Sequence, residues 1–297
     1  MKSETPLVSI WSITYNHARF IKDCLEGVLS QKTNFKYELI IGDDASTDGT
    51  SEILREYAAK YPEIIRPIFH KSNVGIYKNS IETVLPELKG KYIAICEGDD
   101  YWTDPYKLQK QVDFLEGNEG YNGCAHNVNV LTNKNVCDIH PGLLENDLLM
   151  ENILFDRDYN FIPTCSIVFR NNCFTIDELV FFNDFGDWPL LYLLCKNSKL
   201  KFLQDSMGIY RKHEGGYTTI NKESMLLKII KFYYEISFLH PEYKKECLVK
   251  IGELESKILI ERNSLIKVLR SKKYLSVNLG YREILKILIS KVKTPKA

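Results

Sequence analysis

The stretch GKYIAICEGDDYWTDPYKLQKQVDFL, residues 90–115, places an acidic cluster between two patterns of secondary structure. The apolar run KYIAICE, residues 91–97, predicts a buried strand, and YKLQKQVDFLE, residues 106–116, predicts an amphipathic helix. Three acidic side chains lie where the strand should end: Glu97, Asp99 and Asp100. Carboxylates this close repel one another unless a cation or a set of hydrogen-bond donors compensates them. We therefore expect a compensating partner opposite this strand end.

The residues before this stretch alternate between strand and helix patterns. Strands are expected at LVSIWSIT, YELIIGDD and EIIRPIFH, which are residues 7–14, 37–44 and 63–70. Helices are expected at residues 18–31, 49–61 and 78–88, the last interrupted near Pro86. This alternation predicts an α/β fold with a mostly parallel central sheet flanked by helices. Ligands of such sheets bind beyond the carboxyl ends of the strands.

The patterns divide the chain into three parts. Residues 1–105 form the alternating half described above. Residues 106–220 mix helices with strands and include a buried helix at DWPLLYLLCK, residues 187–196, and a strand or hairpin at residues 200–213. Residues 221–297 predict a helical C-terminal extension.

Composition narrows the class of protein. The 297 residues carry 39 Lys and Arg against 39 Asp and Glu, so the net charge is zero and gives a nucleic-acid partner no support. The eight cysteines form no C-x-x-C pair, which leaves a zinc cluster unsupported. No leader-like apolar stretch begins the sequence and no window approaches about 18 uninterrupted apolar residues, so we expect no spanning helix. A reducing cytoplasm is the expected location.

Acidic residues end two of the expected strands. Asp43 and Asp44 end the second strand, as Glu97, Asp99 and Asp100 end the fourth. Both sets should face one crevice, because the carboxyl ends of parallel strands meet at the same edge. One or two carboxylates at a time suit Mg²⁺ or Mn²⁺ that carries a phosphate-bearing substrate. The alternative is that these acids are turn and cap residues, which is a common role for Asp.

Several segments together resemble a known family: VSIWSITYNHARFIKDCLEGVLSQ, YELIIGDDASTDGT, NVGIYKN and residues 90–115. They are similar to the inverting family-2 glycosyltransferases with the GT-A fold, and the match runs from Leu7 to Leu115. The resemblance implies transfer of a sugar from a nucleotide diphosphate donor, expected to be a UDP-sugar, assisted by Mn²⁺ or Mg²⁺. The acceptor would be a hydroxyl of a glycan or lipid-linked molecule, in the synthesis of surface polysaccharide such as capsule or lipopolysaccharide O-antigen.

The resemblance also implies which residues bind the donor. They are Thr14, Tyr15, Asn16, Asp44, Asn73, Gly75, Lys78, Asn79, Asp99, Arg211 and His213. Asp44 would hydrogen-bond the base edge, and residues 73–79 would close over the nucleotide. In the D-x-D-type element, Asp99 would lie near the ribose and the metal, and Asp100 would be the main metal ligand. Many relatives carry Asp where this chain has Glu97, so a metal contact or a water-mediated role stays open for that residue.

An inverting transfer needs a base that deprotonates the attacking acceptor hydroxyl. In relatives this base is an acid shortly before a helix in the second half of the domain. Here FNDFGDWPLLYLL, residues 182–194, offers Asp184 and Asp187. Asp187 directly precedes Trp188-Pro189 and matches better, so it is the predicted base. Its alternative role is that of a helix N-cap.

The C-terminal part is basic. From Lys244 to Ala297, 14 Lys and Arg stand against 5 Glu, a net charge of +9. After Ser264, apolar stripes alternate with lysines, a pattern that suits peripheral binding to the anionic inner face of a cell membrane. The alternative is a helix packed on the catalytic domain or on a second subunit, as in a homodimer.

Other classes of protein fit less well. A sugar nucleotidyltransferase would carry a glycine-rich phosphate loop after the first strand, where this chain has SITYNHARF. A Rossmann dehydrogenase would carry G-x-G-x-x-G after a strand, and this sequence has none. The remaining alternative is a catalytically silent glycan-binding or scaffold subunit with the same fold. Retention of Asp44, Asp99, Asp100 and Asp187 argues against it.

Overall fold

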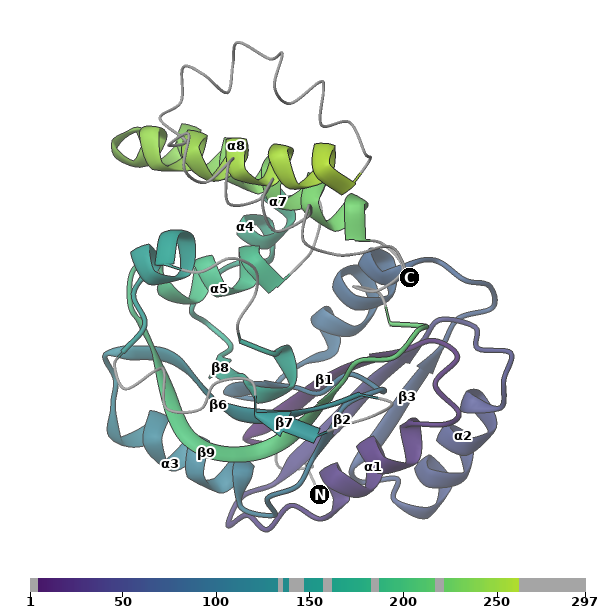
Figure 1. Cartoon of the computed structure of the whole chain (residues 1–297). Helices are drawn as coiled ribbons and strands as arrows, with labels where there is room; N and C mark the ends of the chain where they lie inside the picture. Colours follow the sequence, from purple (N-terminus) through teal and green to yellow (C-terminus); the bar gives the residue numbers. More distant parts are fainter. Residues whose placement is uncertain are drawn as a thin grey trace. The chain divides into compact units, whose positions relative to one another are not determined.

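The chain divides into two compact units, residues 1–214 and residues 215–297. The first contains the sheet and the second is helical (Figure 1). The structure, a computed structural model, describes residues 5–132, 136–138, 147–156, 162–182, 187–216 and 222–261.

The first half of the larger unit is a parallel sheet, as the alternation of patterns predicts. In chain order its strands are β1 (Val8–Thr14), β2 (Tyr37–Asp43), β3 (Ile65–Phe69) and β4 (Tyr92–Ile95). They lie side by side in the order β3-β2-β1-β4, and each pairing is parallel. The intervening helices are α1 (Ile21–Leu29) and α2 (Thr50–Lys60). In α1 the buried Ile21, Cys24, Leu25 and Val28 recur every three or four residues, which is the period of a helix face.

The expected short helix at residues 78–88 takes a less regular form. A π-helix, η1 (Lys78–Val84), is followed by a single 3₁₀ turn, η2 (Leu85–Glu87). Pro86 lies in η2 and has no N–H to continue the helical ladder of hydrogen bonds. The change of helix type therefore falls where the sequence interrupts the α-helical pattern.

The second half of the sheet is mixed. Beyond β4 the order continues through β8 (Val168–Arg170), β6 (Tyr121–Leu131), β9 (Lys199–Arg211) and β5 (Tyr101–Trp102), while β7 (Val136–Asp138) pairs with β6. The β6–β9 pairing is parallel, and the others in this half are antiparallel. Over the described ranges the sheet has nine strands, which confirms the α/β class. Residues 200–213, expected as a strand or hairpin, lie mostly in the single long strand β9.

Helical segments accompany the second half of the sheet. They are α3 (Lys107–Gly117), η3 (Asn152–Asp156), η4 (Thr164–Ser166), α4 (Ile176–Phe181) and α5 (Asp187–Cys195). The expected helix at residues 187–196 is confirmed as α5, and its residues from Trp188 to Cys195 are buried. A helix that is apolar around its whole circumference is expected to be buried, as α5 is.

The carboxyl ends of β1, β2 and β4 meet at one edge of the sheet. Thr14 pairs with Asp43 across β1 and β2. After β4 the chain continues beside β1, because the N–H of Gly98 donates to the carbonyl of Ile13 at 3.0 Å. A Cβ atom at Gly98 would lie 2.7 Å from Oγ1 of Thr14, so only glycine permits this close approach. The acidic segment from Glu97 to Asp100 is thereby held against the end of β1.

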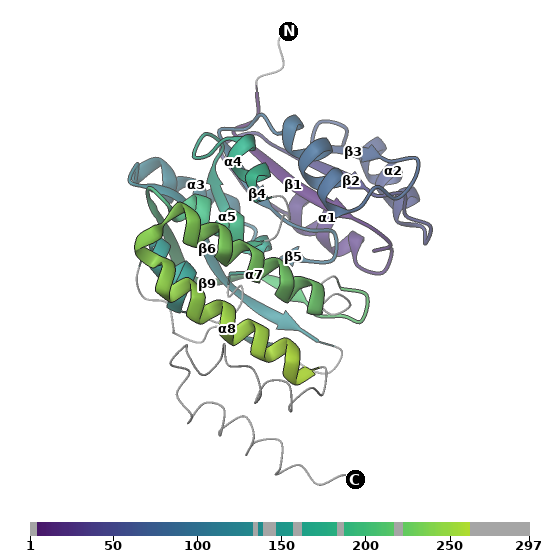
Figure 2. The same ribbon diagram turned by 90° about the horizontal axis from the view of Figure 1, so that it is seen from above.

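The C-terminal unit contains two long helices, α7 (Lys222–Leu239) and α8 (Lys244–Glu261), joined by the 3₁₀ turn η5 (Pro241–Tyr243). The two helices run side by side and pack on each other (Figure 2). This confirms the helical C-terminal region. None of the helices that the structure describes is long and apolar enough to cross a membrane. The basic segment after Ser264 lies outside the described residues, so its membrane contact stays a prediction.

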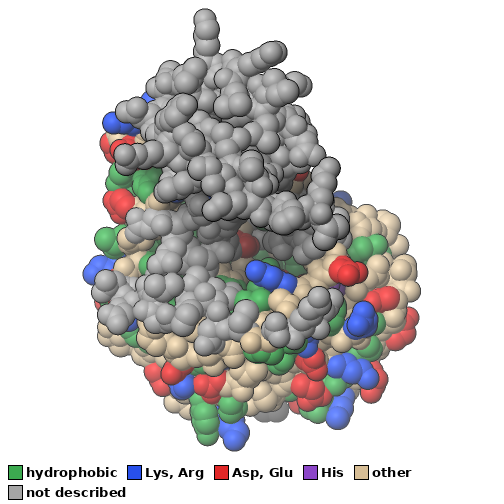
Figure 3. All heavy atoms as spheres, in the orientation of Figure 1, with side chains coloured by type: hydrophobic (Ala, Val, Ile, Leu, Met, Phe, Trp, Pro, Cys, Tyr) green, Lys and Arg blue, Asp and Glu red, His purple; other side chains and the backbone are tan. Residues whose placement is uncertain are grey.

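Charged side chains of both signs are interspersed over the described part of the face drawn in Figure 3.

Candidate functional site

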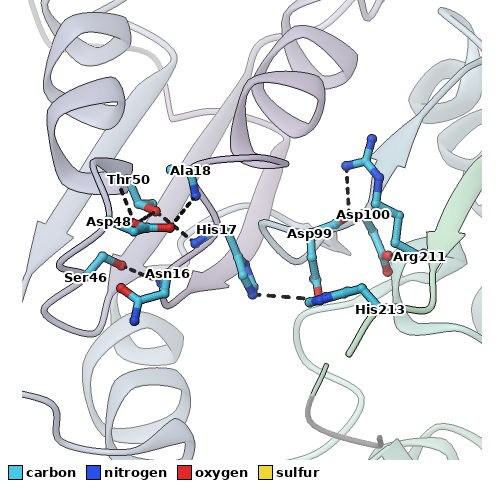
Figure 4. A network of polar contacts seen from close by, with 10 residues as sticks. All are labelled: Asn16, His17, Ala18, Ser46, Asp48, Thr50, Asp99, Asp100, Arg211 and His213. Atoms are coloured by element: carbon cyan, nitrogen blue, oxygen red, sulfur yellow. Dashed lines mark hydrogen bonds and ion pairs between the residues drawn. The ribbon is translucent and has the colours of Figure 1, made fainter. Parts of the chain in front are cut away.

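The turn after β1 is tied to the loop after β2. Three consecutive backbone N–H groups donate to side-chain oxygens of that loop and of the first residue of α2: Asn16 to Ser46, His17 to Thr50 and Ala18 to Asp48, each at 2.9 Å (Figure 4). Asn16 has a φ of +55°, a left-handed conformation in which Asn is enriched. Its side-chain oxygen accepts the N–H of Thr47 at 2.8 Å. The predicted pocket residue Asn16 thus shapes the turn through both its backbone and its side chain.

The other two residues of this predicted pocket segment differ in exposure. Thr14 is buried beside Gly98, whereas the Tyr15 side chain is 45 % exposed. Tyr15 is therefore available to a ligand at the edge of the sheet, and Thr14 contributes mainly to packing.

Both acids at the end of β2 are engaged by the polypeptide itself. The Asp43 carboxylate accepts the N–H of Ser46 at 3.2 Å and the hydroxyls of Ser46 and Ser51. The Asp44 carboxylate accepts two backbone N–H groups, from Val74 at 2.7 Å and from Gly75 at 3.0 Å. Asp43 therefore acts as a turn residue, which is the alternative to metal binding that the sequence pattern allowed. Asp44 anchors the segment that was expected to close over a nucleotide.

That segment, residues 73–79, has an exposed part and a buried part. Asn73 and Lys78 are exposed, and Gly75 adopts a φ of +85°. Asn79 is buried, where its amide donates to the carbonyl of Gly42 at 2.9 Å and its oxygen lies 3.1 Å from Nε2 of His70. Of the predicted contacts here, Asn73 and Lys78 can reach a ligand, while Asn79 fixes the base of the segment.

Asp99 faces two histidines from distant parts of the chain (Figure 4). Its Oδ2 lies 3.1 Å from Nε2 of His213 and 3.8 Å from Nε2 of His17. One ligand atom from each of these three residues lies within 4.8 Å of the others, a spacing that could hold a metal ion. The side chains of His17, Asp99 and His213 remain 16 %, 20 % and 13 % exposed, so a small ion can reach them.

The protonation of this cluster follows from its surroundings. Burial would raise the pKa of Asp99, but the hydrogen bond with His213 and the nearby His17 outweigh it and lower the pKa. Burial lowers the pKa of His17, and the charge of Asp99 only partly opposes it. A carboxylate beside a neutral imidazole is the expected state, and both groups then offer lone pairs to a cation.

Asp100 points away from this cluster. It is 2 % exposed, and its Oδ1 accepts the backbone N–H of Arg211 at 2.8 Å. Burial, together with the charges of Asp99 and Glu97, raises its pKa well above the ordinary value. Asp100 therefore fixes the end of β9, at Arg211, next to the acidic segment.

Arg211 links several parts of the site. Its guanidinium donates to the carbonyl of Asp99 at 3.1 Å and pairs with Asp23 of α1. It also lies over two aromatic rings, 4.5 Å from the centroid of Tyr101 and 5.1 Å from that of Phe20. Its cationic head is therefore held in place beside the acidic segment.

Glu97 and the predicted base Asp187 lie close enough to influence each other. Burial, reinforced by the charges of Asp187 and Asp99, raises the pKa of Glu97 to about 8, against a hydrogen bond with Thr164 that favours the charged form. The buried Oε2 of Glu97 has no hydrogen-bond partner among the described residues. Asp187 is the first residue of α5, as expected for a helix start. Asp184 lies outside the described residues.

His17 was not predicted as a site residue. The pocket was assigned to the three residues before it, and the histidine in the same turn received no role. The available signal was position, because His17 directly follows Asn16 at a strand end that neighbours the acidic segment. His213, which the resemblance assigned to donor binding, also joins this cluster.

Comparison with known proteins places this site in a family. The family model described as Glycosyl transferase family 2 matches residues 9–173, more than half of the chain. The chain belongs to this family. The matched range includes the turn after β1, the loop after β2 and the acidic segment, but neither Asp187 nor His213.

Individual proteins are also similar to this chain. An uncharacterized protein of Mycobacterium tuberculosis is 39 % identical over 211 residues, which cover 70 % of this chain and 60 % of the relative. The chain thus spans less than two thirds of that relative's length. The putative teichuronic acid biosynthesis glycosyltransferase TuaG of Bacillus subtilis is 37 % identical over 117 residues, 39 % of this chain and 44 % of the relative.

The fold has solved counterparts. A crystal structure of S. aureus TarS in complex with UDP aligns with a TM-score of 0.57 at 14 % sequence identity. The alignment covers 93 % of this chain and 91 % of the TarS chain. At this level of identity the likeness concerns the fold, and it confirms the GT-A-type α/β architecture expected from the sequence.

Proposed function

We propose that the protein is an inverting glycosyltransferase that moves a sugar from a nucleotide diphosphate donor to an acceptor hydroxyl. The observation that carries the proposal is the convergence of Asp99, His17 and His213 at the strand ends of a family-2 domain. We further propose a base for this site, Asp187, whose charge, like that of Asp99, helps to raise the pKa of Glu97 in the acidic segment.

The residues present fit a divalent ion. Asp99 offers a carboxylate oxygen and His213 an imidazole nitrogen 3.1 Å away, both partly accessible. We assign the main ligand role to Asp99, although the sequence favoured Asp100, because Asp100 is buried and bonded to the backbone of Arg211. A bound ion would stabilise the negative charge that develops on a departing nucleoside diphosphate.

The donor nucleotide is expected at the edge formed by the β1 and β2 ends. The exposed ring of Tyr15 and the segment anchored by Asp44 border this edge. Asp44 acts through that segment, since both of its oxygens already accept backbone N–H groups. The donor is proposed to be a UDP-sugar, in line with the UDP-bound state of TarS, which shares the fold.

Asp187 is proposed as the general base. Its carboxylate would accept the proton of the acceptor hydroxyl as that oxygen attacks the anomeric carbon from the face opposite the leaving group. Asp187 is the first residue of the buried helix α5, so the helix limits the movement of its carboxylate. Arg211, fixed beside the acidic segment, supplies positive charge near the diphosphate.

The acceptor is proposed to be a growing glycan or a lipid-linked carrier in surface polysaccharide synthesis. Support comes from the relative TuaG, whose name assigns it to teichuronic acid biosynthesis. A lipid-linked acceptor would agree with peripheral membrane binding by the basic C-terminal part, residues 244–297, which carries a net charge of +9.

A donor screen tests the proposal. The full chain is incubated with Mn²⁺ or Mg²⁺ and a panel of UDP-, GDP- and dTDP-sugars, and release of the nucleoside diphosphate is measured with and without glycan acceptors. We expect metal-dependent release from one donor and faster release with acceptor. Metal-dependent nucleotide binding without turnover of any donor would instead favour the silent glycan-binding subunit.

A further inference from the structure

We propose that His17 is a protein ligand of the metal ion, so that the site prefers a first-row transition ion to Mg²⁺. His17, Asp99 and His213 would then hold the ion from three separate segments, and the donor would complete its coordination. The inference rests on the proposed function, because it concerns the ion that assists the same reaction.

His17 is held in place before any ion binds. Its backbone N–H donates to Thr50 at 2.9 Å, in the turn that is tied to the neighbouring loop on both sides of it. Its ring contacts Phe20 edge-on with centroids 6.2 Å apart, and Phe20 also lies 4.6 Å from the ring of His213. The two imidazoles thus contact the same aromatic ring and lie next to each other, with centroids 6.0 Å apart, as a preformed ligand pair requires.

The spacing suits an ion better than a direct hydrogen bond. At 3.8 Å, Nε2 of His17 is too far from Oδ2 of Asp99 for a hydrogen bond. Adjacent ligands about 2.1 Å from an octahedral ion lie about 3.0 Å apart. The Asp99–His213 distance of 3.1 Å already meets this value. His17 needs to approach by less than about 1 Å, which a small rotation of the side chain provides.

The donor set determines which ions bind well. Two imidazoles with one carboxylate form a softer set than the all-oxygen ligands that Mg²⁺ prefers. Affinity should rise from Mn²⁺ toward the later first-row ions, while Mg²⁺ gains little from either nitrogen. Asp99 supplies one oxygen ligand and His213 one nitrogen ligand. A second nitrogen from His17 would make nitrogen the majority among the three protein ligands and so shift the preference away from Mg²⁺.

Ion binding to the full chain tests this role directly. Binding of MnCl₂ is followed by the electron paramagnetic resonance signal of free Mn²⁺, and MgCl₂ is measured by competition. The variants are His17→Ala, which removes the ligand, and His17→Asp, which replaces nitrogen by oxygen. His240→Ala is the matched control, because His240 lies on the other unit and pairs with Glu242.

We expect His17→Ala to weaken Mn²⁺ binding at least about tenfold while Mg²⁺ binding changes by less than about threefold. His17→Asp should recover binding with a preference shifted toward Mg²⁺, and His240→Ala should match the wild type. Pulsed resonance spectra should report two coordinated imidazoles in the wild type and one in His17→Ala. Circular dichroism establishes whether each variant folds. If His17→Ala does not fold, the change in ion preference of His17→Asp still tests the inference.

Other outcomes would overturn the inference. These are unchanged Mn²⁺ affinity in His17→Ala, equal losses for both ions, a single imidazole in the wild-type spectrum, or no Mn²⁺ binding by the wild type. Donor turnover is measured on the same preparations. If the wild type turns over a donor normally but gives any of these results, the proposed function stands and only the role of His17 is refuted. If the wild type binds Mn²⁺ through nitrogen but turns over no donor, the proposed function is refuted and the metal site stands.

Discussion

Lys107, the first residue of α3, is expected to destabilise the larger unit at neutral pH. Its side chain is fully buried, with Nζ 3.9 Å from the centroid of the Trp102 ring. Within the described part of the chain Nζ has no hydrogen-bond partner. The titratable groups that influence it are the thiols of Cys96, Cys124 and Cys165, whose own pKa values burial helps to raise, so they carry no compensating charge.

The size of the effect follows from proton linkage. Burial lowers the pKa of Lys107 from 10.5 to about 7. Between those two values the unfolded chain binds more protons than the folded one, so stability rises with pH through this range. The cost to folding is about 4 kcal/mol at pH 7 and about 2 kcal/mol at pH 9. Replacing Lys107 by Met removes this term and forfeits less than about 1 kcal/mol of contact with Trp102.

We therefore expect Lys107→Met to raise the free energy of unfolding by about 3 kcal/mol at pH 7, with the gain falling by about 2 kcal/mol at pH 9. Urea unfolding is followed by tryptophan fluorescence, which reports on the larger unit because Trp11, Trp102 and Trp188 all lie in it. Lys91→Met is the control, since Lys91 is exposed and pairs with Glu116. A destabilised Lys107→Met, or a gain independent of pH, would refute the reasoning.

Three further substitutions test the site and its supports. Asp187→Asn should lower turnover at least about a hundredfold, because it removes the proposed base, while calorimetry shows UDP affinity within about threefold of the wild type. Gly98→Ala would place a Cβ atom 2.7 Å from Thr14 Oγ1, so we expect a loss of about 1–3 kcal/mol in urea unfolding and weaker Mn²⁺ binding. Asp44→Asn should cost about 1–3 kcal/mol in the same assay, because one backbone N–H loses its acceptor.

Matched controls separate these effects from general damage. Asp177→Asn, on an exposed position of α4, should leave turnover and unfolding close to wild type. A Cβ atom at Gly117 would meet no atom within 4 Å, so Gly117→Ala should be neutral or mildly stabilising. Full turnover in Asp187→Asn would move the base role to another acid, with Asp184 next by position. A stable Gly98→Ala would show that the segment adjusts without strain.

The parallel half of the fold could be predicted because its signals are local. Each strand of β1 to β4 is a short apolar run, and α1 and α2 repeat their apolar residues at the helical period. The mixed half depends on pairings between distant segments. The chain returns at β8 to pair antiparallel with β4, and no local period encodes that choice. The strands of the first half were therefore predicted in both place and direction, whereas the short strands β5 and β7 of the second half were not predicted.

Sequence position also predicted which acids gather at the sheet edge, but not which of their oxygens are already bonded. Asp43 and Asp44 both lie at the predicted strand end, yet five hydrogen bonds from the loops engage their carboxylates. Those donors come from residues 46, 51, 74 and 75. The hydrogen bonds therefore depend on how the chain folds after each strand, which the sequence pattern does not predict. A cluster of acids in sequence thus marks a site without naming its ligands.

The same limit decides between Asp99 and Asp100. Asp99 lies in a tight turn, in which the N–H of Asp100 donates to the carbonyl of Glu97 at 3.1 Å. Of the two acidic side chains that follow Gly98, Asp99 is the one that faces the histidines. Which one does so depends on β9, whose residue Arg211 donates its backbone N–H to Asp100 across 111 positions of sequence. Pairing of β5 with β9 brings that N–H into place and turns Asp99 toward His213. The choice of the proposed metal ligand would therefore depend on the pairing of β5 with β9, and weakening this pairing should weaken ion binding even though the three proposed ligands are unchanged.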